Sequence, residues 1–280
     1  MARFAIKTPT HHTTWSSMLE VWKTADEIDV FESAWNFDHF YPLRGDTSGP
    51  CLEAWVTLSA LAQATSRIRV GTMVCGMHFR HPAVTASMAS SLDIVSGGRL
   101  ELGLGAGWYE LEADAYGFEL GTIGERMTRF EEGTEVIHRL LTQETTDFDG
   151  EFFTLREARN EPKPVQEPRP PIVVGGRGEK RTLRLAARHA SMWDAMFVED
   201  ELDEWRRLRD VLWQHCSDVG RDPSEVTLSS HLRLDPDPDP SEVTARADAL
   251  FDAGVDVVLL AFTAQHNAST VEKLGSALSG

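Results

Sequence analysis

The stretch IRVGTMVCGMHFRHPAVTASMASSLDIVSGGRLELGLG, residues 68–105, predicts a strand, a helix and a second strand in direct succession. Ile68–Cys75 and Arg99–Gly105 are short, largely apolar runs, which are typical of buried strands. Pro82–Val95 predicts a helix, and its proline stands in the first turn, where a missing N–H costs nothing. Strands that alternate with helices in this way form parallel sheets.

The same alternation continues on both sides of this stretch. The remaining predicted strands are Arg3–Thr8, Ser33–Asp38, Pro171–Gly175, Met192–Val198, Val226–Leu234 and Asp256–Phe262. The remaining predicted helices are Trp15–Ile28, Cys51–Ala64, Gly124–Leu141, Glu179–Ala187, Asp200–Cys216, Ser241–Ala253 and Ser269–Leu278. About eight strand-then-helix units favour an α/β fold, a (β/α)8 TIM barrel forming one domain over residues 1–280. An open, doubly wound sheet is the alternative.

One segment interrupts the alternation. Between residues 145 and 166, the pair Asp149–Gly150 is flanked by alternating apolar residues, which predicts a hairpin insertion. Barrel enzymes carry their chemistry on the loops that follow the strands. We therefore expect the functional residues directly after the strands, with the hairpin near that face of the barrel.

Charge and cysteine content exclude several classes of partner and site. The chain has 44 acidic and 27 basic residues and a formal net charge of −17, which would repel nucleic acid and anionic membrane surfaces. No apolar run is long enough to cross a bilayer, and the N-terminus has no apolar signal region. The three widely spaced cysteines predict neither a disulfide framework nor a paired-cysteine metal site. We expect a cytoplasmic protein that binds neither membrane nor nucleic acid.

The segment GGRGEKR, Gly175–Arg181, follows a predicted strand and opens a predicted helix. Glycines let backbone N–H groups approach an anion, and a helix N-terminus adds partial positive charge. Arg177, Lys180 and Arg181 supply the cations that a protein of net charge −17 would need to hold a phosphate. A glycine-rich turn with solvated basic residues is the alternative.

Histidines follow the first two predicted strands. His39, after Asp38, is the candidate acid/base, since imidazole titrates near neutral pH; a purely orienting histidine is the alternative. His12 is preferred over His11 for contact with the substrate, because a register two residues beyond the strand turns it inward. No HExxH or comparable spacing is present, so no metal site is expected.

Two common motifs are absent or incomplete. GLGAGW, Gly103–Trp108, lacks the third glycine and the distant acidic residue of a dinucleotide-binding loop. Its small residues are interpreted as room for a planar ring close to the backbone, or as a tight strand exit. No GxSxG nucleophile elbow occurs, which removes the commonest hydrolase interpretation.

Four motifs carry a family resemblance: WNFDHF (35–40), VGTMVCGMHFRHPA (70–83), LDIVSGGRLELGLGAGWYELEADAYGF (92–118) and VVGGRGEKRTLRLAARHA (173–190). With them the chain resembles luciferase-like monooxygenases, most closely the branch that uses the deazaflavin coenzyme F420. The resemblance implies a bacterial-luciferase-like TIM barrel that holds an isoalloxazine-like ring at its C-terminal mouth. It also implies a non-prolyl cis peptide at Met73–Val74, or one residue later, behind the ring.

The resemblance assigns cofactor-binding roles to residues of this chain. Those expected at the ring are Asp38, Thr72, Met73, Val74, Cys75, Gly105, Ala106 and Trp108, and those expected at the phosphate are Gly175, Gly176, Arg177, Gly178 and Lys180. Related sugar-phosphate dehydrogenases carry a glutamate at the position of Trp108 and a tryptophan at that of Leu43, so a sugar phosphate is not expected as substrate. Trp15, Phe79, Trp108 and Phe197 instead favour an apolar or aromatic substrate pocket, although barrel core would explain some of them equally well.

These residues lead to one preferred function and two alternatives. The preferred function is hydride transfer between F420 and a small organic substrate such as an activated alkene, imine or ketone, with His39 donating or accepting the accompanying proton. The first alternative is a monooxygenase that uses reduced FMN, and the second is a non-catalytic flavin-binding barrel. The resemblance also favours a homodimer, supplied with reduced cofactor by a separate reductase.

Overall fold

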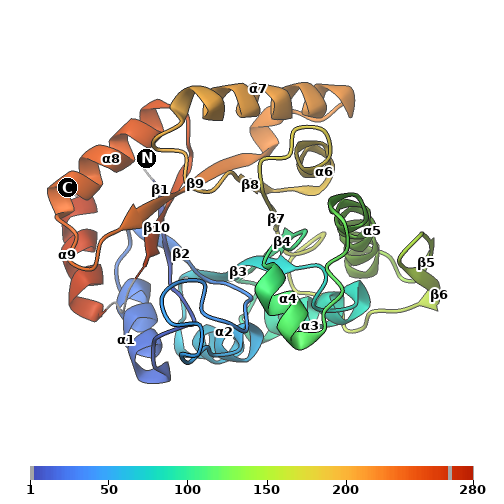
Figure 1. Cartoon of the computed structure of the whole chain (residues 1–280), viewed down its shortest axis with the longest axis horizontal. Helices are drawn as coiled ribbons and strands as arrows, with labels where there is room; N and C mark the ends of the chain where they lie inside the picture. Colours follow the sequence, from blue (N-terminus) through green and yellow to red (C-terminus); the bar gives the residue numbers. More distant parts are fainter. Residues whose placement is uncertain (1–2, 264–266, 280) are drawn as a thin grey trace.

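The computed structural model describes residues 3–263 and 267–279 (Figure 1). The predicted domain limits at residues 1 and 280 lie outside this part of the chain, and the single-domain extent stays a prediction.

Within the described residues, eight parallel strands close into a barrel in the order β1-β10-β9-β8-β7-β4-β3-β2. These strands are β1 (Arg3–Lys7), β2 (Phe31–Asn36), β3 (Arg69–Gly76), β4 (Leu100–Gly105), β7 (Ile172–Gly175), β8 (Met192–Asp194), β9 (Thr227–Leu234) and β10 (Val257–Phe262). The predicted TIM barrel is confirmed, and the open sheet is excluded because β1 pairs with both β2 and β10.

Helices surround the barrel, as Figure 1 shows. They are α1 (Trp15–Asp26), α2 (Ala54–Ala64), α3 (Pro82–Val95), α4 (Glu110–Tyr116), α5 (Ile123–Thr142), α6 (Thr182–His189), α7 (Leu202–Asp218), α8 (Pro240–Asp252) and α9 (Ala268–Leu278). A short 3-10 turn, Pro223–Glu225, precedes β9. The capping box of α5, in which Thr122 and Glu125 satisfy each other's backbone amides, fixes where that long helix begins.

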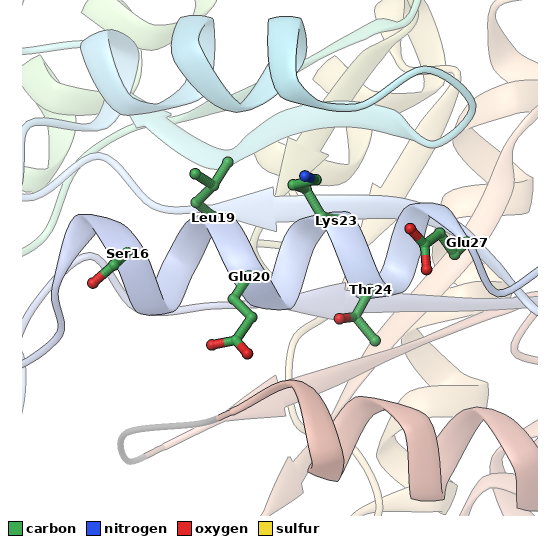
Figure 2. A pocket seen from close by; sticks show the side chains of 6 residues that line it. All are labelled: Ser16, Leu19, Glu20, Lys23, Thr24 and Glu27. Atoms are coloured by element: carbon green, nitrogen blue, oxygen red, sulfur yellow. The ribbon is translucent and has the colours of Figure 1, made fainter.

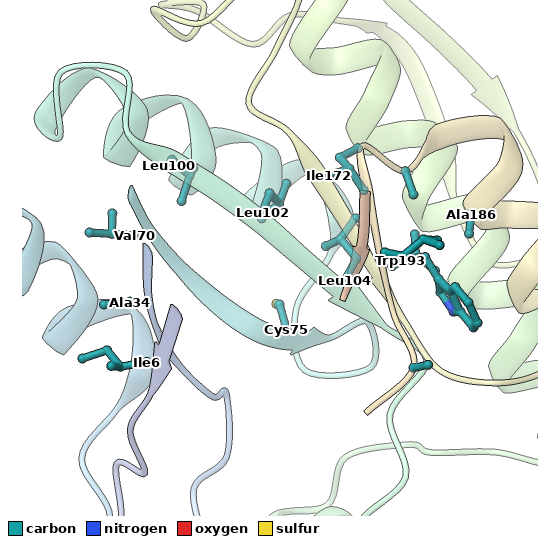
Figure 3. Close-up of a cluster of buried hydrophobic side chains, with 14 of the residues drawn as sticks. Ile6, Ala34, Val70, Cys75, Leu100, Leu102, Leu104, Ile172, Ala186 and Trp193 are labelled. Atoms are coloured by element: carbon teal, nitrogen blue, oxygen red, sulfur yellow. The ribbon is translucent and has the colours of Figure 1, made fainter. Parts of the chain in front are cut away.

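The apolar residues form two cores on opposite faces of the strands. Ala5, Met73 and Leu259 belong to the cluster inside the barrel. Side chains such as Ile6, Leu102 and Trp193 point outward against the helices, in the cluster drawn in Figure 3. Because side chains alternate along a strand, this division tells which residues of each strand point into the mouth.

Three differences from the predicted elements concern the mouth. The strand β8 ends at Asp194 instead of Val198, since the chain leaves the sheet and Met196 takes a positive φ of 61°. The helix α6 begins at Thr182 instead of Glu179, which leaves a longer glycine loop after β7. The helix α4 was not predicted, because it is only 7 residues long.

The predicted hairpin insertion is confirmed as β5 (Thr146–Asp149) and β6 (Thr154–Ala158), which pair antiparallel beside α5 (Figure 1). The carboxylate of Glu132 on α5 accepts backbone hydrogen bonds from residues 151–153 at its turn. The segment that follows lies toward the amino ends of the strands, where Gln166 bonds to Asp93 and to the carbonyl of Leu100. The turn of the hairpin approaches the carboxyl ends of the strands at the contact of Phe153 with His81.

Among the described residues, no helix combines the length and apolarity that crossing a bilayer would require.

Candidate functional site

His39 lies at the mouth of the barrel and is held by a carboxylate from a distant part of the sequence. Its Nδ1 is 2.9 Å from Oε2 of Glu112, which lies 73 residues further along the chain on α4. Glu112 is fully buried, and its other oxygen accepts the backbone N–H groups of Phe40 and Tyr41. Glu112 therefore fixes both the imidazole of His39 and the loop that carries it.

The electrostatics of this pair favour an ionised Glu112. Burial raises the pKa of Glu112, but the hydrogen bond and charge of His39 and the amides of Phe40 and Tyr41 outweigh burial and hold the pKa below its ordinary value. A carboxyl whose pKa is lower in the folded than in the unfolded state stabilises the fold above its ordinary pKa. That contribution is lost as the pH falls through the folded-state pKa.

Asp38, predicted to lie at the ring, is a member of a buried ion pair. Its two oxygens are 2.5 and 3.0 Å from the guanidinium nitrogens of Arg80, which also reaches Glu53 at 3.0 Å. Burial lowers the pKa of Arg80, but the bonds to Asp38 outweigh this and raise it overall. Asp38 thus ties the end of β2 to the loop that follows β3.

We expect Arg80→Met to lower the free energy of unfolding by about 3–5 kcal/mol, because it leaves the Asp38 carboxylate buried without its main counter-charge. Chemical denaturation measures the loss. The matched control is Arg156→Met, which breaks an exposed pair with Asp149 and should cost at most about 1 kcal/mol. Equal costs for the two variants would show that the Asp38–Arg80 pair does not organise the loop.

Met73 and Val74 form the irregular part of β3, and their peptide bond is cis, as the resemblance implied. The register between β3 and β4 shifts between Thr72 and Cys75. The side chain of Val74 lies over Gly103, Gly105 and Gly175, where added Cβ atoms would come within 3.2, 2.5 and 3.2 Å of its methyl groups. Gly103 and Gly105 of GLGAGW therefore leave space for the Val74 side chain in the bulge of β3, before any space is left for a ligand.

The other predicted ring residues are distributed around the bulge. Met73 points into the barrel, whereas Cys75 belongs to the outer core and lies 3.8 Å from Arg80. Thr72 is buried and donates to Asn36 at 2.9 Å, and Ala106 packs against the outer core. Burial first, and then the charge of Asp38, raises the pKa of the Cys75 thiol well above its usual range, so the structure gives this cysteine no role as a nucleophile.

The glycine loop after β7 keeps the shape of an anion site, but its arginines have other partners. Gly176 has a φ of +123°, which favours glycine, and no side chain caps the N-terminus of α6. Arg177 donates to the carbonyls of Ala195 and Phe197 and pairs with Glu201, and Arg181 pairs with Glu131. Lys180 is exposed and forms no hydrogen bond or ion pair within the described part of the chain, so it is the cation that remains available at this loop.

The two histidines after β1 occupy different places. His12, with a positive φ of 52°, turns toward the loop at Gly49, and its Nε2 lies 3.1 Å from the carbonyl of Arg44. His11 is buried against Phe37, with ring centres 5.4 Å apart. Trp15, the other predicted substrate residue, begins α1 and is 39% exposed. His11 and His39 thus contact the same ring, since the ring centre of Phe37 also lies 5.7 Å from that of His39.

An aromatic wall stands beside His39. We define it as Phe79, Trp108 and Tyr109, whose ring centres lie 6.2, 5.8 and 6.0 Å from the imidazole. Trp108 stacks on Tyr109 and is nevertheless 59% exposed. A large exposed aromatic ring next to a half-buried histidine is a surface on which an organic ligand can pack.

Three polar residues inside the barrel were missed by the sequence interpretation. His231 lies 3.2 Å from Asp194 and 3.2 Å from the sulfur of Met73, and both His231 and Asp194 are buried. Lys7 ends β1. Burial lowers its pKa and the charge of Asp194 raises it by less, so that the pKa is about 8. The sequence did contain a signal for them, because each is a charged or polar residue at an inward position of an otherwise apolar strand.

One depression of the outer surface lies on a helix that surrounds the barrel. It runs along α1 and is lined by Ser16, Leu19, Glu20, Lys23, Thr24 and Glu27 (Figure 2). These are side chains of one exposed helix face, with no catalytic grouping among them. Across the described residues, no three His, Cys, Asp or Glu side chains gather as metal ligands.

Comparison with known proteins adds a family and relatives. The model of the family described as luciferase-like monooxygenase matches residues 1–277. An uncharacterized protein of Mycobacterium tuberculosis is 32% identical over 247 residues, which cover 85% of this chain and 82% of that protein. The F420-dependent hydroxymycolic acid dehydrogenase of the same species is 32% identical over 209 residues, covering 74% of this chain and 56% of the relative.

A solved structure supports the fold. An F420-dependent secondary alcohol dehydrogenase in complex with an F420-acetone adduct superposes with a TM-score of 0.84 at 20% identity, over 99% of this chain and 98% of the other. At that identity the similarity establishes the barrel and its topology alone.

Proposed function

The chain belongs to the luciferase-like monooxygenase family, a family of oxidoreductases, and from this premise we propose that it transfers a hydride between coenzyme F420 and a small organic substrate. The observation that carries the proposal is the His39–Glu112 pair beside the Met73–Val74 bulge and the exposed ring of Trp108. The named F420-dependent relative supports the choice of cofactor.

The residues of the mouth fit such a cofactor. Gly175–Gly178, Lys180 and the uncapped N-terminus of α6 would hold its phosphate, and Met73 and Val74 would support one face of its ring. When bound, a deazaflavin supplies a carbon centre that gives or takes a hydride. Arg177 would act indirectly, because its bonds to the loop at residues 195–201 shape the phosphate loop.

The chain itself would supply orientation and a proton. Glu112 holds Nδ1 of His39, which leaves Nε2 to donate or accept the proton that accompanies the hydride. The aromatic wall would exclude water from the reacting face and position the substrate. Glu112 is a positioning residue in this scheme, since it acts through His39.

The expected binding result is micromolar affinity for oxidised F420, measured by fluorescence titration. We expect Lys180→Ala to weaken it by about tenfold, because a charge-assisted contact to phosphate is lost. Lys23→Ala, which removes an exposed lysine of α1, is the control and should change the affinity less than twofold. Equal binding by wild type and K180A would remove the phosphate role of the glycine loop.

A reduced-FMN monooxygenase is the second candidate, favoured by the description of the family itself. The same phosphate loop would serve FMN, so the two candidates differ in the ring. Parallel titrations with FMN and F420 separate them, because the oxidised cofactors absorb at different wavelengths. FMN binding without F420 binding would establish this candidate and overturn ours. A homodimer, a separate cofactor reductase and a cytoplasmic location stay predictions.

A further inference from the structure

Three cationic side chains lie on one side of the mouth. Lys7 on β1 pairs in register with Ala261 on β10, which pairs with Arg233 on β9. Ala5 and Leu259 stand two residues before Lys7 and Ala261 and belong to the cluster inside the barrel. Lys7, Ala261 and Arg233 therefore have their side chains on the inner face of the barrel, and the small, buried Ala261 stands on the strand between the two cations.

Aromatic rings position the two strand cations. The ammonium of Lys7 lies 5.8 Å from the ring centre of Phe37. The guanidinium of Arg233 lies 4.5 Å from that of Phe197, which in turn contacts His231 inside the barrel. Rings direct a cation without neutralising it, so both charges stay available to an anion.

Arg44, on the loop between β2 and α2, is the third cation. Its carbonyl lies 3.1 Å from Nε2 of His12, which follows β1 at the mouth, and burial first and then the neighbouring charge of Arg233 lower the pKa of Arg44. Arg44 and His39 also act together on His11, whose pKa falls to about 4 through burial first and then through the charges of His12, His39 and Arg44. Contacts place Arg44 at the same end of the barrel as His39, because its carbonyl bonds to His12, which packs on His11, and His11 and His39 both contact Phe37.

No carboxylate compensates for these charges at close range. The chain has a net charge of −17, yet Lys7, Arg44 and Arg233 form no ion pair with any residue in 3–263 or 267–279. The residues outside those ranges carry no acidic side chain. Asp194 is the acid that acts on Lys7, and it is already bonded to His231 and Ser229. The like charges of Arg44 and Arg233 disfavour each other's charged form, and an anionic ligand between them would relieve this.

We propose that Lys7, Arg44 and Arg233 form a subsite for an anionic group of the organic substrate, a carboxylate or a phosphate. The aromatic wall at Trp108 takes the apolar part of the same molecule, which places its reactive carbon near His39. The substrate class that this arrangement fits is a small apolar or aromatic acid. The assignment to a substrate rests on the proposed function, whereas anion binding at this place does not.

Calorimetric titration with benzoate, and with benzamide as its neutral analogue, tests the subsite at pH 7. We expect wild type to bind benzoate at least tenfold more tightly than benzamide, and R44Q and R233Q each to lose most of that preference. Arg188→Gln is the control: Arg188 is exposed, unpaired among the described residues and in the last turn of α6, at the other end of the barrel. Equal affinities for benzoate and benzamide, or the same loss in R188Q, would overturn the subsite.

Lys7→Met separates a binding role from a structural one. Burial makes the charge of Lys7 unfavourable, so we expect this variant to raise Tm while abolishing the preference for benzoate. A lower Tm with an unchanged preference would make Lys7 a structural residue and remove it from the subsite.

Titration of the same variants with oxidised F420 distinguishes substrate from cofactor. If the anionic group belongs to the substrate, R44Q and R233Q bind F420 within twofold of wild type. A tenfold loss of F420 affinity would assign the cations to the cofactor and overturn our assignment. If wild type binds neither F420 nor FMN but still prefers benzoate, the proposed function fails and the anion subsite stands.

Discussion

His39→Gln is expected to lower kcat by about 10²- to 10⁴-fold, the usual contribution of a positioned acid/base, while the affinity for the cofactor stays within about twofold. Glutamine keeps a polar side chain that can still bond to Glu112, so the loop at Phe40 and Tyr41 is retained. What is lost is the imidazole, the side chain that could donate and accept the proton. The measurement is the steady-state rate of oxidation of reduced F420 by saturating activated alkenes, imines and ketones, which gives kcat.

The control for this prediction is His138→Gln, which changes a half-buried histidine of α5 that accepts a bond from Arg169 far from the mouth. We expect no change in kcat from it. Turnover by H39Q equal to that of wild type would make His39 an orienting residue. Absence of turnover in both H39Q and wild type, with cofactor binding intact, would favour a non-catalytic flavin-binding barrel.

The barrel could be predicted from the sequence because its signal is local. Pro82–Val95 begins with proline at its first position and matches the predicted helix at both ends. Buried parallel strands such as β10, Val257–Phe262, are continuous apolar runs. They can therefore be recognised from their own sequence, without knowing which strands lie beside them. Two of the ends that were misplaced, at β8 and α6, border the mouth, where loop geometry is decided by tertiary contacts such as those of Arg177.

The site could be predicted only as far as strand ends reveal it. His39 is visible because it directly follows a strand, whereas Glu112 comes from a short helix in another part of the chain. Sequence also cannot tell which anion a cation will bind. Arg177 looked available for a phosphate and bonds to the chain instead, while Lys7, Arg44 and Arg233 form no ion pair within the described residues. Which of these cations finds a partner is decided by the tertiary contacts that form when the barrel closes.

Gly103→Ala adds a single methyl group, and we expect it to lower the free energy of unfolding more than the same substitution at any other described glycine. A Cβ at Gly103 would lie 2.0 Å from the carbonyl oxygen of Thr72 and 3.2 Å from a methyl of Val74. The nearer atom belongs to the backbone of β3, so no side-chain rotation relieves the contact and β3 must move away from β4. We expect a loss of at least about 3 kcal/mol in the free energy of unfolding, or about 6–12 °C in Tm by calorimetry.

The matched control adds the same methyl group where there is space for it. Gly124 lies in the first turn of α5, and a Cβ there would meet only Thr122 Oγ1, at 3.9 Å. Because alanine is the better helix former, Gly124→Ala should raise the stability by up to about 1 kcal/mol.

Gly103→Ala should also affect the candidate site, since the strand that must move carries Met73 and Val74. If G103A does fold, its F420 affinity should fall by more than its loss of Tm alone would explain at the assay temperature. An unchanged Tm and an unchanged affinity would show that the contact of β3 with Gly103 does not position the bulge.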